Sequence, residues 1–214
     1  MKYYNQNATI DWGDLTDVVC GDYEQPTQRP PDFIGIGAQK SATTWLWTQL
    51  QRSPSVAMPP IKELHYFDRH LSASPFPSAN ALLRLSDNTW KNQICDTLRH
   101  AVDSDDKLRI HQLMHYYFSD WNDTWYRELF GLTPPDQITG EITPRYAICD
   151  DKGVQHMASI APHTKIIFCI RLNMNKWKRF LLLTEGGLNG VTPNLLIPLK
   201  QHEEHLCFLI FSTK

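Results

Sequence analysis

The residues best suited to chemistry lie between positions 33 and 45, where a short apolar segment runs into a helical pattern. Lys40 supplies a positive charge in this stretch, and Ser41, Thr43 and Thr44 supply hydroxyl donors. Glycines just before the lysine let another group approach the backbone closely. Unpaired N–H groups and the positive end of the helix dipole gather where a helix begins, so an anion is attracted there. The stretch therefore predicts a phosphate or sulfate site at a strand-to-helix turn.

Two common nucleotide-binding motifs fit this loop less well. The phosphate loop of nucleoside triphosphatases has a glycine directly before its lysine, and Gln39 occupies that position here. The dinucleotide-binding motif needs a glycine where Lys40 stands, and no convincing acidic ribose ligand follows at the expected distance. A P-loop kinase is therefore a less favoured hypothesis. A turn with a solvated lysine remains the purely structural alternative, because short glycine motifs are permissive.

A second group of reactive side chains lies at residues 62–68. Glu63 could accept a proton at neutral pH if its surroundings bring its pKa close to that of the acceptor. In an extended segment Glu63 and His65 would share one face, because strand side chains alternate. They could therefore face one site together. His65 could equally be a hydrogen-bonded packing residue, and Lys62 a solvated flank.

Histidine pairs and a run of aromatic residues allow further interpretations. His111 and His115 have helical spacing, and His202 and His205 flank two glutamates, but neither pair has a convincing third ligand. We therefore expect no metal. Aromatic side chains could line a cleft for a substrate, although packing in the core is the favoured use; they are Tyr116, Tyr117, Phe118, Trp121, Trp125 and Tyr126.

Apolar segments alternate between strand and helix patterns along the chain. Strands are expected at 33–36, 56–60, 164–170 and 206–211, with a strand edge at 137–144. Helices are expected at 44–52, 79–103 with interruptions, 108–130 and 154–160. The segment 164–170 is apolar and β-branched, which is typical of a central parallel strand buried on both faces. The fold class is therefore α/β: a P-loop-like three-layer sandwich with a central parallel sheet flanked by helices.

Composition limits the classes of protein that the chain can belong to. Its 214 residues, 42% of them hydrophobic, can bury one sizeable core, so we expect a single domain at 32–214 after a polar, proline-rich lead-in at 1–31. A net charge of -2 gives no basic field for nucleic acid or an anionic membrane. No segment resembles a signal peptide or a membrane span, and the five cysteines form no CxxC motif. We expect a soluble cytoplasmic protein with free thiols.

The anion loop resembles one known family. The run GIGAQKSATTWLWTQL resembles the 5′-phosphosulfate loop of the sulfotransferases that use 3′-phosphoadenosine 5′-phosphosulfate (PAPS), commonly written Lys-[Ser/Cys/Ala]-Gly-Thr-[Thr/Ser]-x-Leu. The matching residues are Lys40, Ser41, Thr43, Thr44 and Leu46. Ala42 replaces the usual glycine, which exchanges one small residue for another.

Further segments agree with this family in order and spacing. KELHYFD at 62–68 is similar to the Lys-Glu-x-His-Phe-Phe-Asp segment of the heparan-sulfate type. WYRELF at 125–130, followed by GEITPRY at 140–146, resembles a pattern of the bacterial and carbohydrate branches. KIIFCIR at 165–171 resembles the strand that delivers an arginine to the 3′-phosphate of the cofactor. The resemblance covers about residues 32–171, and the order of four motifs makes it specific.

The resemblance implies an enzyme that moves a sulfuryl group from PAPS to a hydroxyl or amine of a carbohydrate or small molecule. The product nucleotide would be 3′-phosphoadenosine 5′-phosphate (PAP), and no metal is required. Lys40 would stabilise the leaving group, Glu63 would be the catalytic base, and His65 would lie beside it. The residues expected to bind the cofactor are Gln39, Lys40, Ser41, Ala42, Thr43, Thr44, Trp45, Arg171 and Arg179.

The match is weaker beyond Arg171. The family continues with Arg-[Asn/Asp]-Pro-x-x-Arg-x-x-Ser, whereas Asn173 replaces the proline here and Arg179 replaces the serine. Residues 180–214 lack the family's later helices and glycine-rich loop. The chain is then either a divergent short member or one that has lost its C-terminal part, and the second possibility predicts an inactive protein that binds PAP or PAPS. Ile142 also stands where the carbohydrate branch often has lysine, which weakens the case for heparan-like acceptors.

Overall fold

The computed structural model describes residues 26–69, 80–81, 83, 88–173, 195–201 and 204–212, with only the backbone described from residue 171 onward. The strands are β1 (Phe33–Gly37), β2 (Val56–Ala57), β3 (Ile138–Ile142), β4 (Lys165–Asn173), β5 (Leu195–Gln201) and β6 (Glu204–Ser212). The α-helices are α2 (Thr43–Gln51), α4 (Asn88–Asp103), α5 (Lys107–Phe118), α6 (Asp123–Gly131) and α7 (Asp151–Ile160), and a 3-10 helix, η1, spans Pro144–Ile148.

The strands form one sheet in the order β2-β3-β1-β4-β6-β5. Strands β2, β3, β1 and β4 run parallel to one another, so the predicted α/β fold with a parallel sheet is confirmed. The predicted strand at 206–211 lies within β6, which is antiparallel to β4, and β5 pairs antiparallel with β6. Strand β3 lies between β2 and β1, so the prediction of a strand edge at 137–144 is wrong.

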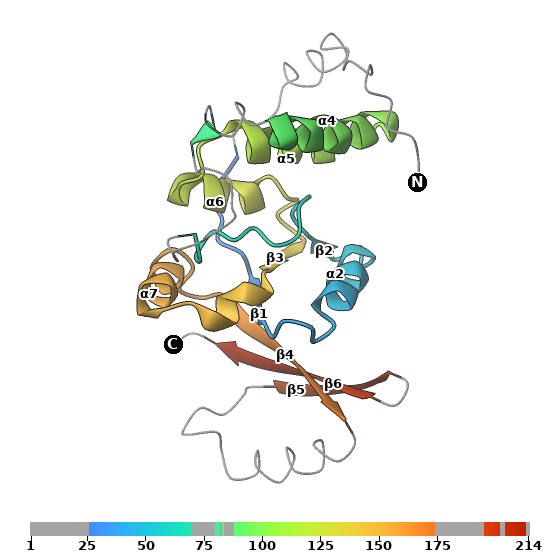
Figure 1. Ribbon diagram of the computed structural model, residues 1–214, viewed down its shortest axis with the longest axis vertical. Coiled ribbons are helices and arrows are strands. Elements are labelled where there is room, and N and C mark those ends of the chain that lie inside the picture. The colour runs from blue at the N-terminus through green and yellow to red at the C-terminus, as the bar shows by residue number, and fades with distance from the viewer. Residues whose placement is uncertain are drawn as a thin grey trace.

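Helices cover both faces of the sheet, with α2 on one side and α7 on the other (Figure 1). Phe33, Ile142 and Ile167 point to one face, where they pack against Trp47 of α2. Ile34 points to the opposite face and joins a larger core with residues of α4 to α7. Because side chains alternate along a strand, the unbroken apolar sequence of β1 supplies both faces.

Helices α4, α5 and α6 gather at one end of the molecule (Figure 1), and their aromatic side chains form most of the larger core. Trp125, Tyr126 and Tyr117 are fully buried, as the favoured interpretation of the aromatic run predicts. Tyr66 stacks on Tyr126 with ring centroids 4.8 Å apart. Tyr66 therefore anchors the segment that contains Glu63 to the helical core.

Gly140 is required by the close pairing of β3 with β1, where it lies opposite Phe33. A Cβ atom at this position would meet the carbonyl oxygen of Phe33 at 2.5 Å and its ring at 2.6 Å. Gly140→Ala is therefore expected to lower the free energy of unfolding by about 1–3 kcal/mol, because the strands must move apart. Chemical denaturation measures this difference. Val154→Ala on the exposed surface of α7 is the control, and equal effects of the two changes would contradict the account.

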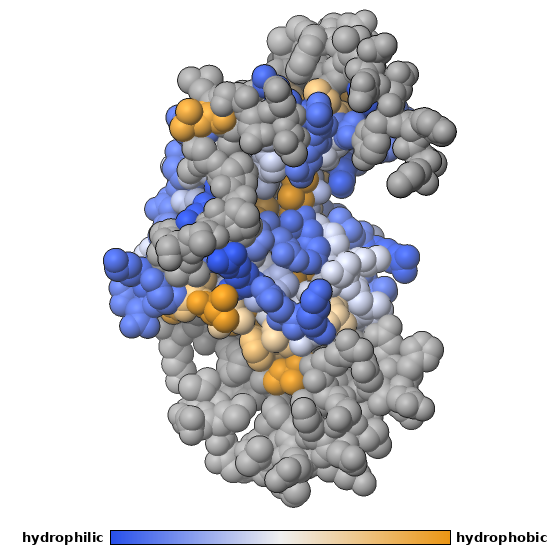
Figure 2. All heavy atoms as spheres, viewed as in Figure 1, coloured by the Kyte–Doolittle hydropathy of each residue, from blue (hydrophilic) through white to orange (hydrophobic). Residues whose placement is uncertain are grey.

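The described atoms on the face shown in Figure 2 are mostly hydrophilic, with separate hydrophobic spots. Within the described residues, no helix combines the length and the apolar character needed to cross a membrane.

Candidate functional site

Loops that follow β1, β2 and β3 meet at the carboxyl edge of the parallel strands. This is the edge where open α/β sheets bind ligands. A cavity of about 510 Å³ opens between the loops. The residues that line it are Gln39, Lys40, Ala42, Thr43, Thr44, Glu63 and Pro144. The structure thus brings Glu63 to the anion loop, although they belong to different connections of the sheet.

The loop after β1 presents an uncapped helix start to this cavity. Ala42 is the N-cap of α2, its φ is 58°, and no side chain caps the helix. By contrast, α5, α6 and α7 are each capped by an Asp or Asn side chain. The first N–H groups of α2 therefore lack a side-chain acceptor, and its first turn has no acidic residue. Such a helix start favours a bound anion.

The left-handed conformation of Ala42 has a steric cost. Glycine adopts a positive φ without such a cost, whereas alanine pays roughly 1–2 kcal/mol in this region. Lys40 also has a positive φ, of 61°, and the N–H of Ala38 donates to the carbonyl of Cys169 at 2.9 Å. That bond fastens the loop to β4.

Four of the residues predicted to bind the cofactor are not among the described residues that line this cavity. Ser41 is buried, and it does not line the cavity. Trp45 is also absent from the lining and packs with Cys169 of β4. Arg171 lies in β4 opposite Leu206 of β6, but its side chain is outside the described part. Arg179 lies outside the described residues altogether. The part of the predicted site that would hold a 3′-phosphate therefore stays a prediction.

Glu63, His65 and Asp68 form a line of contacts. His65 Nε2 is 3.5 Å from Glu63 Oε2, and His65 Nδ1 is 3.0 Å from Asp68 Oδ2. Asp68 is fully buried, and Arg145 Nε lies 3.4 Å from the same carboxylate oxygen. Lys62 forms an ion pair with the other oxygen of Glu63. The buried aspartate thus orients the histidine, and the histidine orients the glutamate.

This segment is not a strand, so the prediction that strand alternation brings Glu63 and His65 together is wrong. Glu63 has a φ of 63° and His65 a φ of 53°. Hydrogen bonds to the neighbouring backbone hold the shape: Tyr66 N–H donates to Tyr146 Oη at 2.8 Å, and Arg69 Nε donates to the His65 carbonyl at 2.9 Å. The two side chains meet because the backbone curls, which local sequence periodicity does not reveal.

Charges around Glu63 hold it in the ionised form. The hydrogen bond with His65 is the main cause that lowers the pKa of Glu63 to about 2, with Lys62 acting in the same direction and burial opposing both. Burial alone would lower the pKa of His65, but Asp68 and Glu63 outweigh it and raise that pKa above 6.5. Glu63 is therefore a carboxylate at neutral pH. The expectation that its surroundings bring its pKa closer to that of the acceptor is wrong, because His65 and Lys62 lower the pKa of Glu63.

A second carboxyl group, that of Glu141 in β3, is fully buried. Its carboxyl group accepts hydrogen bonds from Tyr126 Oη at 2.5 Å, Thr143 Oγ1 at 2.8 Å and Tyr146 Oη at 3.3 Å. Since Tyr146 also accepts the Tyr66 N–H, Glu141 is linked to the segment that carries Glu63. Nothing in the sequence assigns this role to Glu141 beyond its place in the GEITPRY motif.

Burial raises the pKa of Glu141 to about 7, although its hydrogen bonds oppose the shift. The folded protein then binds this proton more tightly than the unfolded chain does, so the free energy of unfolding falls as pH rises from 4.5 to about 7. The free energy of unfolding of the wild-type protein should fall by roughly 3 kcal/mol over this pH window. In Glu141→Gln this fall should be absent, because glutamine does not titrate. Urea denaturation of both proteins at each end of the window measures it. Identical pH profiles would contradict the assignment.

A second cavity, of about 300 Å³, adjoins the first at Glu63. Lys62, Glu63 and His65 border it on one side, and α4 and α5 contribute Trp90 and Tyr116. Of the aromatic residues considered from the sequence, Tyr116 and Trp121 line this cavity, whereas the others do not. Glu63 is thus the residue shared by an anion cavity and an aromatic cavity.

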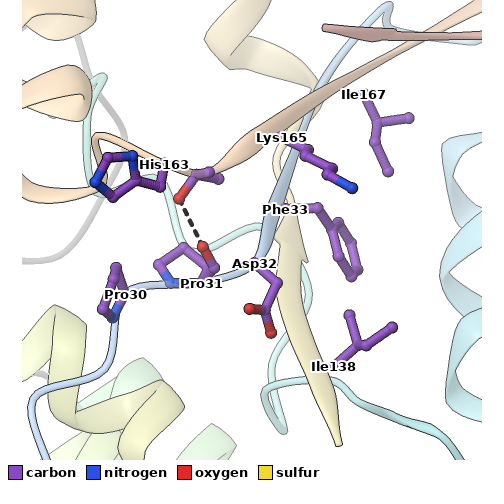
Figure 3. A pocket seen from close by; sticks show the side chains of 9 residues that line it. Pro30, Pro31, Asp32, Phe33, Ile138, His163, Lys165 and Ile167 are labelled. Carbon is purple, nitrogen blue, oxygen red and sulfur yellow. Dashed lines mark hydrogen bonds between the residues drawn. The ribbon is translucent and has the colours of Figure 1, made fainter. Parts of the chain in front are cut away.

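A third cavity, of about 430 Å³, lies at the opposite edge of the sheet, near the start of β1 and β4. Figure 3 shows Phe33, Ile138 and Lys165 on one side of it and His163 on the other. Thr164 Oγ1 donates to the Pro31 carbonyl at 2.6 Å in its wall. None of the residues that the sequence singles out for chemistry lines this cavity.

The described residues contain no group of three or more His, Cys, Asp or Glu side chains arranged to hold a metal ion. His115 Nε2 lies 3.3 Å from the Trp125 carbonyl and 3.7 Å from Glu128. His115, one of the two histidines with helical spacing, therefore takes part in the packing of α5 against α6.

Comparison with protein-family models, curated proteins and solved structures found no match to this chain. A functional conclusion therefore depends on its own residues and their geometry.

Proposed function

We propose that this protein is a PAPS-dependent sulfotransferase, with residues 32–214 forming one P-loop-like domain. The observation that carries the proposal is that Glu63, an ionised carboxylate, borders two adjoining cavities. One contains Lys40 and an uncapped helix start, and the other has aromatic walls. A transferase needs this arrangement, because a donor and an acceptor must meet beside a base.

The phosphosulfate end of PAPS fits the residues of the larger cavity. The N–H groups at the start of α2 and the side chains of Lys40, Thr43 and Thr44 offer positive potential and donors, and Glu63 is the one carboxylate among the described lining residues. Arg171 would serve the 3′-phosphate. When bound, PAPS would supply the sulfuryl group: the acceptor oxygen bonds to sulfur, the bond from sulfur to the bridging oxygen breaks, and that electron pair stays on PAP.

Each residue then has a distinct role. Lys40 stabilises negative charge on the leaving oxygen, in the manner of a preorganised cation. Glu63 accepts the proton of the acceptor hydroxyl. His65 contacts the carboxylate of Glu63, and Asp68 contacts His65. Neither residue lines the donor cavity, so both act by positioning Glu63. The acceptor, a carbohydrate or a small molecule, would occupy the aromatic cavity.

Incubation of the purified protein with sulfur-labelled PAPS and a panel of hydroxyl and amine acceptors tests the proposal. Transfer of label to an acceptor, with release of PAP, is the expected result. Binding of PAP without transfer to any acceptor would indicate an inactive nucleotide-binding protein. Binding of ATP with Mg²⁺ in place of PAP would indicate a kinase and overturn the proposal. The cytoplasmic location stays a prediction.

A further inference from the structure

The segment that carries Glu63 has a strained backbone. Glu63 has a φ of 63° and His65 a φ of 53°, so both lie in the left-handed region. A residue other than glycine adopts this conformation at a steric cost, and it persists there only where surrounding groups hold it. The position of the base therefore depends on contacts that hold this segment from outside.

Tyr146 provides one of these contacts. Tyr66 follows His65 directly, and its backbone N–H donates to Tyr146 Oη at 2.8 Å. Tyr146 is a buried residue of η1, the 3-10 helix that follows β3. Its hydroxyl thus ties the strained segment to an element that is distant in the sequence.

The orientation of the Tyr146 hydroxyl decides whether this bond can form. A phenolic oxygen accepts a hydrogen bond from the Tyr66 N–H only when its own proton points elsewhere. Glu141 supplies an acceptor for that proton, since each of its carboxyl oxygens lies 3.3 Å from Tyr146 Oη. Both side chains are buried, so water is not a ready substitute for the carboxyl group. Glu141 therefore directs the Tyr146 proton away from Tyr66.

Two further hydroxyls fix the carboxyl group of Glu141. Tyr126 Oη donates to Oε1 at 2.5 Å, and Thr143 Oγ1 donates to Oε2 at 2.8 Å. The backbone N–H of Thr143 donates to the Gly35 carbonyl at 2.8 Å, which fastens the end of β3 to β1. Glu141 is thus held by the sheet and by α6, and it can pass this constraint to Tyr146.

The charge of His65 also acts on Glu141. Burial raises the pKa of Glu141 to about 7, while the hydroxyl donors and the charge of His65 act in the opposite direction. The carboxyl group is therefore within electrostatic reach of the histidine that contacts Glu63. Glu141 itself lines neither the donor cavity nor the aromatic cavity. Any effect that it has on the reaction is exerted through other residues.

We propose that Glu141 is a positioning residue: through Tyr146 and the N–H of Tyr66, it fixes the backbone that places Glu63 and His65. The effect on catalysis rests on the sulfotransferase function, whereas the effect on the backbone can be measured without any reaction.

Tyr146→Phe tests the link, because it removes the hydroxyl and leaves Glu141 in place. Hydrogen exchange of the Tyr66 amide, followed by NMR, should become about tenfold faster when its acceptor is lost. The kcat for sulfuryl transfer should fall by about 10–10²-fold, because the base is displaced. Affinity for PAP should not change. Tyr117→Phe is the matched control: it also removes a buried tyrosine hydroxyl, one that donates to Thr97, and should change none of the three quantities.

Glu141→Met tests the same link from its other end. Methionine keeps most of the length of the side chain and removes both acceptor oxygens, so exchange at Tyr66 should again be faster and kcat lower. The double variant with Tyr146→Phe should lose no more kcat than the more impaired single variant, because both changes break one link. Glu141→Gln should lose less kcat than Glu141→Met, since the amide oxygen can still accept from Tyr146.

Wild-type kcat or wild-type exchange at Tyr66 in Tyr146→Phe would overturn the proposal. Losses of kcat that multiply in the double variant would overturn it too, because Glu141 would then act by another route. If Glu141→Met fails to bind PAP, that variant is not folded, and Tyr146→Phe alone decides. Faster exchange at Tyr66 in both variants of a protein that transfers no sulfuryl group would remove the sulfotransferase function and uphold the positioning of Glu63.

Discussion

Lys40→Met is expected to lower kcat for sulfuryl transfer by about 10²–10³-fold, the usual effect of removing one preorganised charge-stabilising group. Lys40 lines the donor cavity beside the uncapped start of α2, where negative charge would develop on the leaving oxygen. Methionine keeps most of the length of the side chain and removes its charge. Affinity for PAP should also fall, because the same cation faces the 5′-phosphate.

Lys165→Met provides the matched control. Lys165 is an exposed lysine at the start of β4, and it lines the cavity at the opposite edge of the sheet. The change removes the same charge from the protein as a whole, so a general electrostatic effect would appear in both variants. Single-turnover rates should fall only for Lys40→Met. Equal rates in the two variants would show that Lys40 does not act on the leaving group.

Glu63→Gln is expected to reduce kcat by about 10²–10⁴-fold, the usual contribution of a general base. Glutamine keeps the shape and the contact with His65 but cannot accept a proton at neutral pH. Affinity for PAP should be retained or increased, since the change removes a negative charge from the anion cavity. Measuring kcat and the affinity for PAP on the same preparation separates loss of the base from loss of the fold.

Glu128→Gln is the control for this change. Glu128 lies on α6 near His115, outside both cavities, and its replacement should leave kcat unchanged. A Glu63→Gln protein with the wild-type kcat would contradict the role of Glu63, and the proton would then need another acceptor.

Much of the fold could be predicted because particular segments have strong patterns. The apolar, β-branched run at 164–170 identifies β4, and the run into Lys40 identifies β1 followed by α2. The β5–β6 hairpin could be predicted only in part, because the sequence indicates 206–211 as a strand and gives no signal for β5. Whether a strand pairs parallel or antiparallel depends on contacts with distant strands, which no local pattern contains.

The candidate site was predictable in its residues and less so in its geometry. Lys40 and Glu63 are recognisable from their motifs, and both line the donor cavity. The positive φ angles of Glu63 and His65 were not predictable, because they depend on bonds to Tyr146 and Arg69, one of them distant in the sequence. Asp68 and Glu141 gain their roles only when the fold buries them.

Calorimetric titration with PAP tests the central claim most directly, since that claim is that the loop before α2 holds the 5′ end of a phosphosulfate nucleotide. We predict that the wild-type protein and Lys165→Met bind PAP with equal affinity at one site, that Lys40→Met binds it more weakly, and that ATP with Mg²⁺ gives no comparable binding. Absence of PAP binding to the wild-type protein, or the same affinity in Lys40→Met, would contradict the claim.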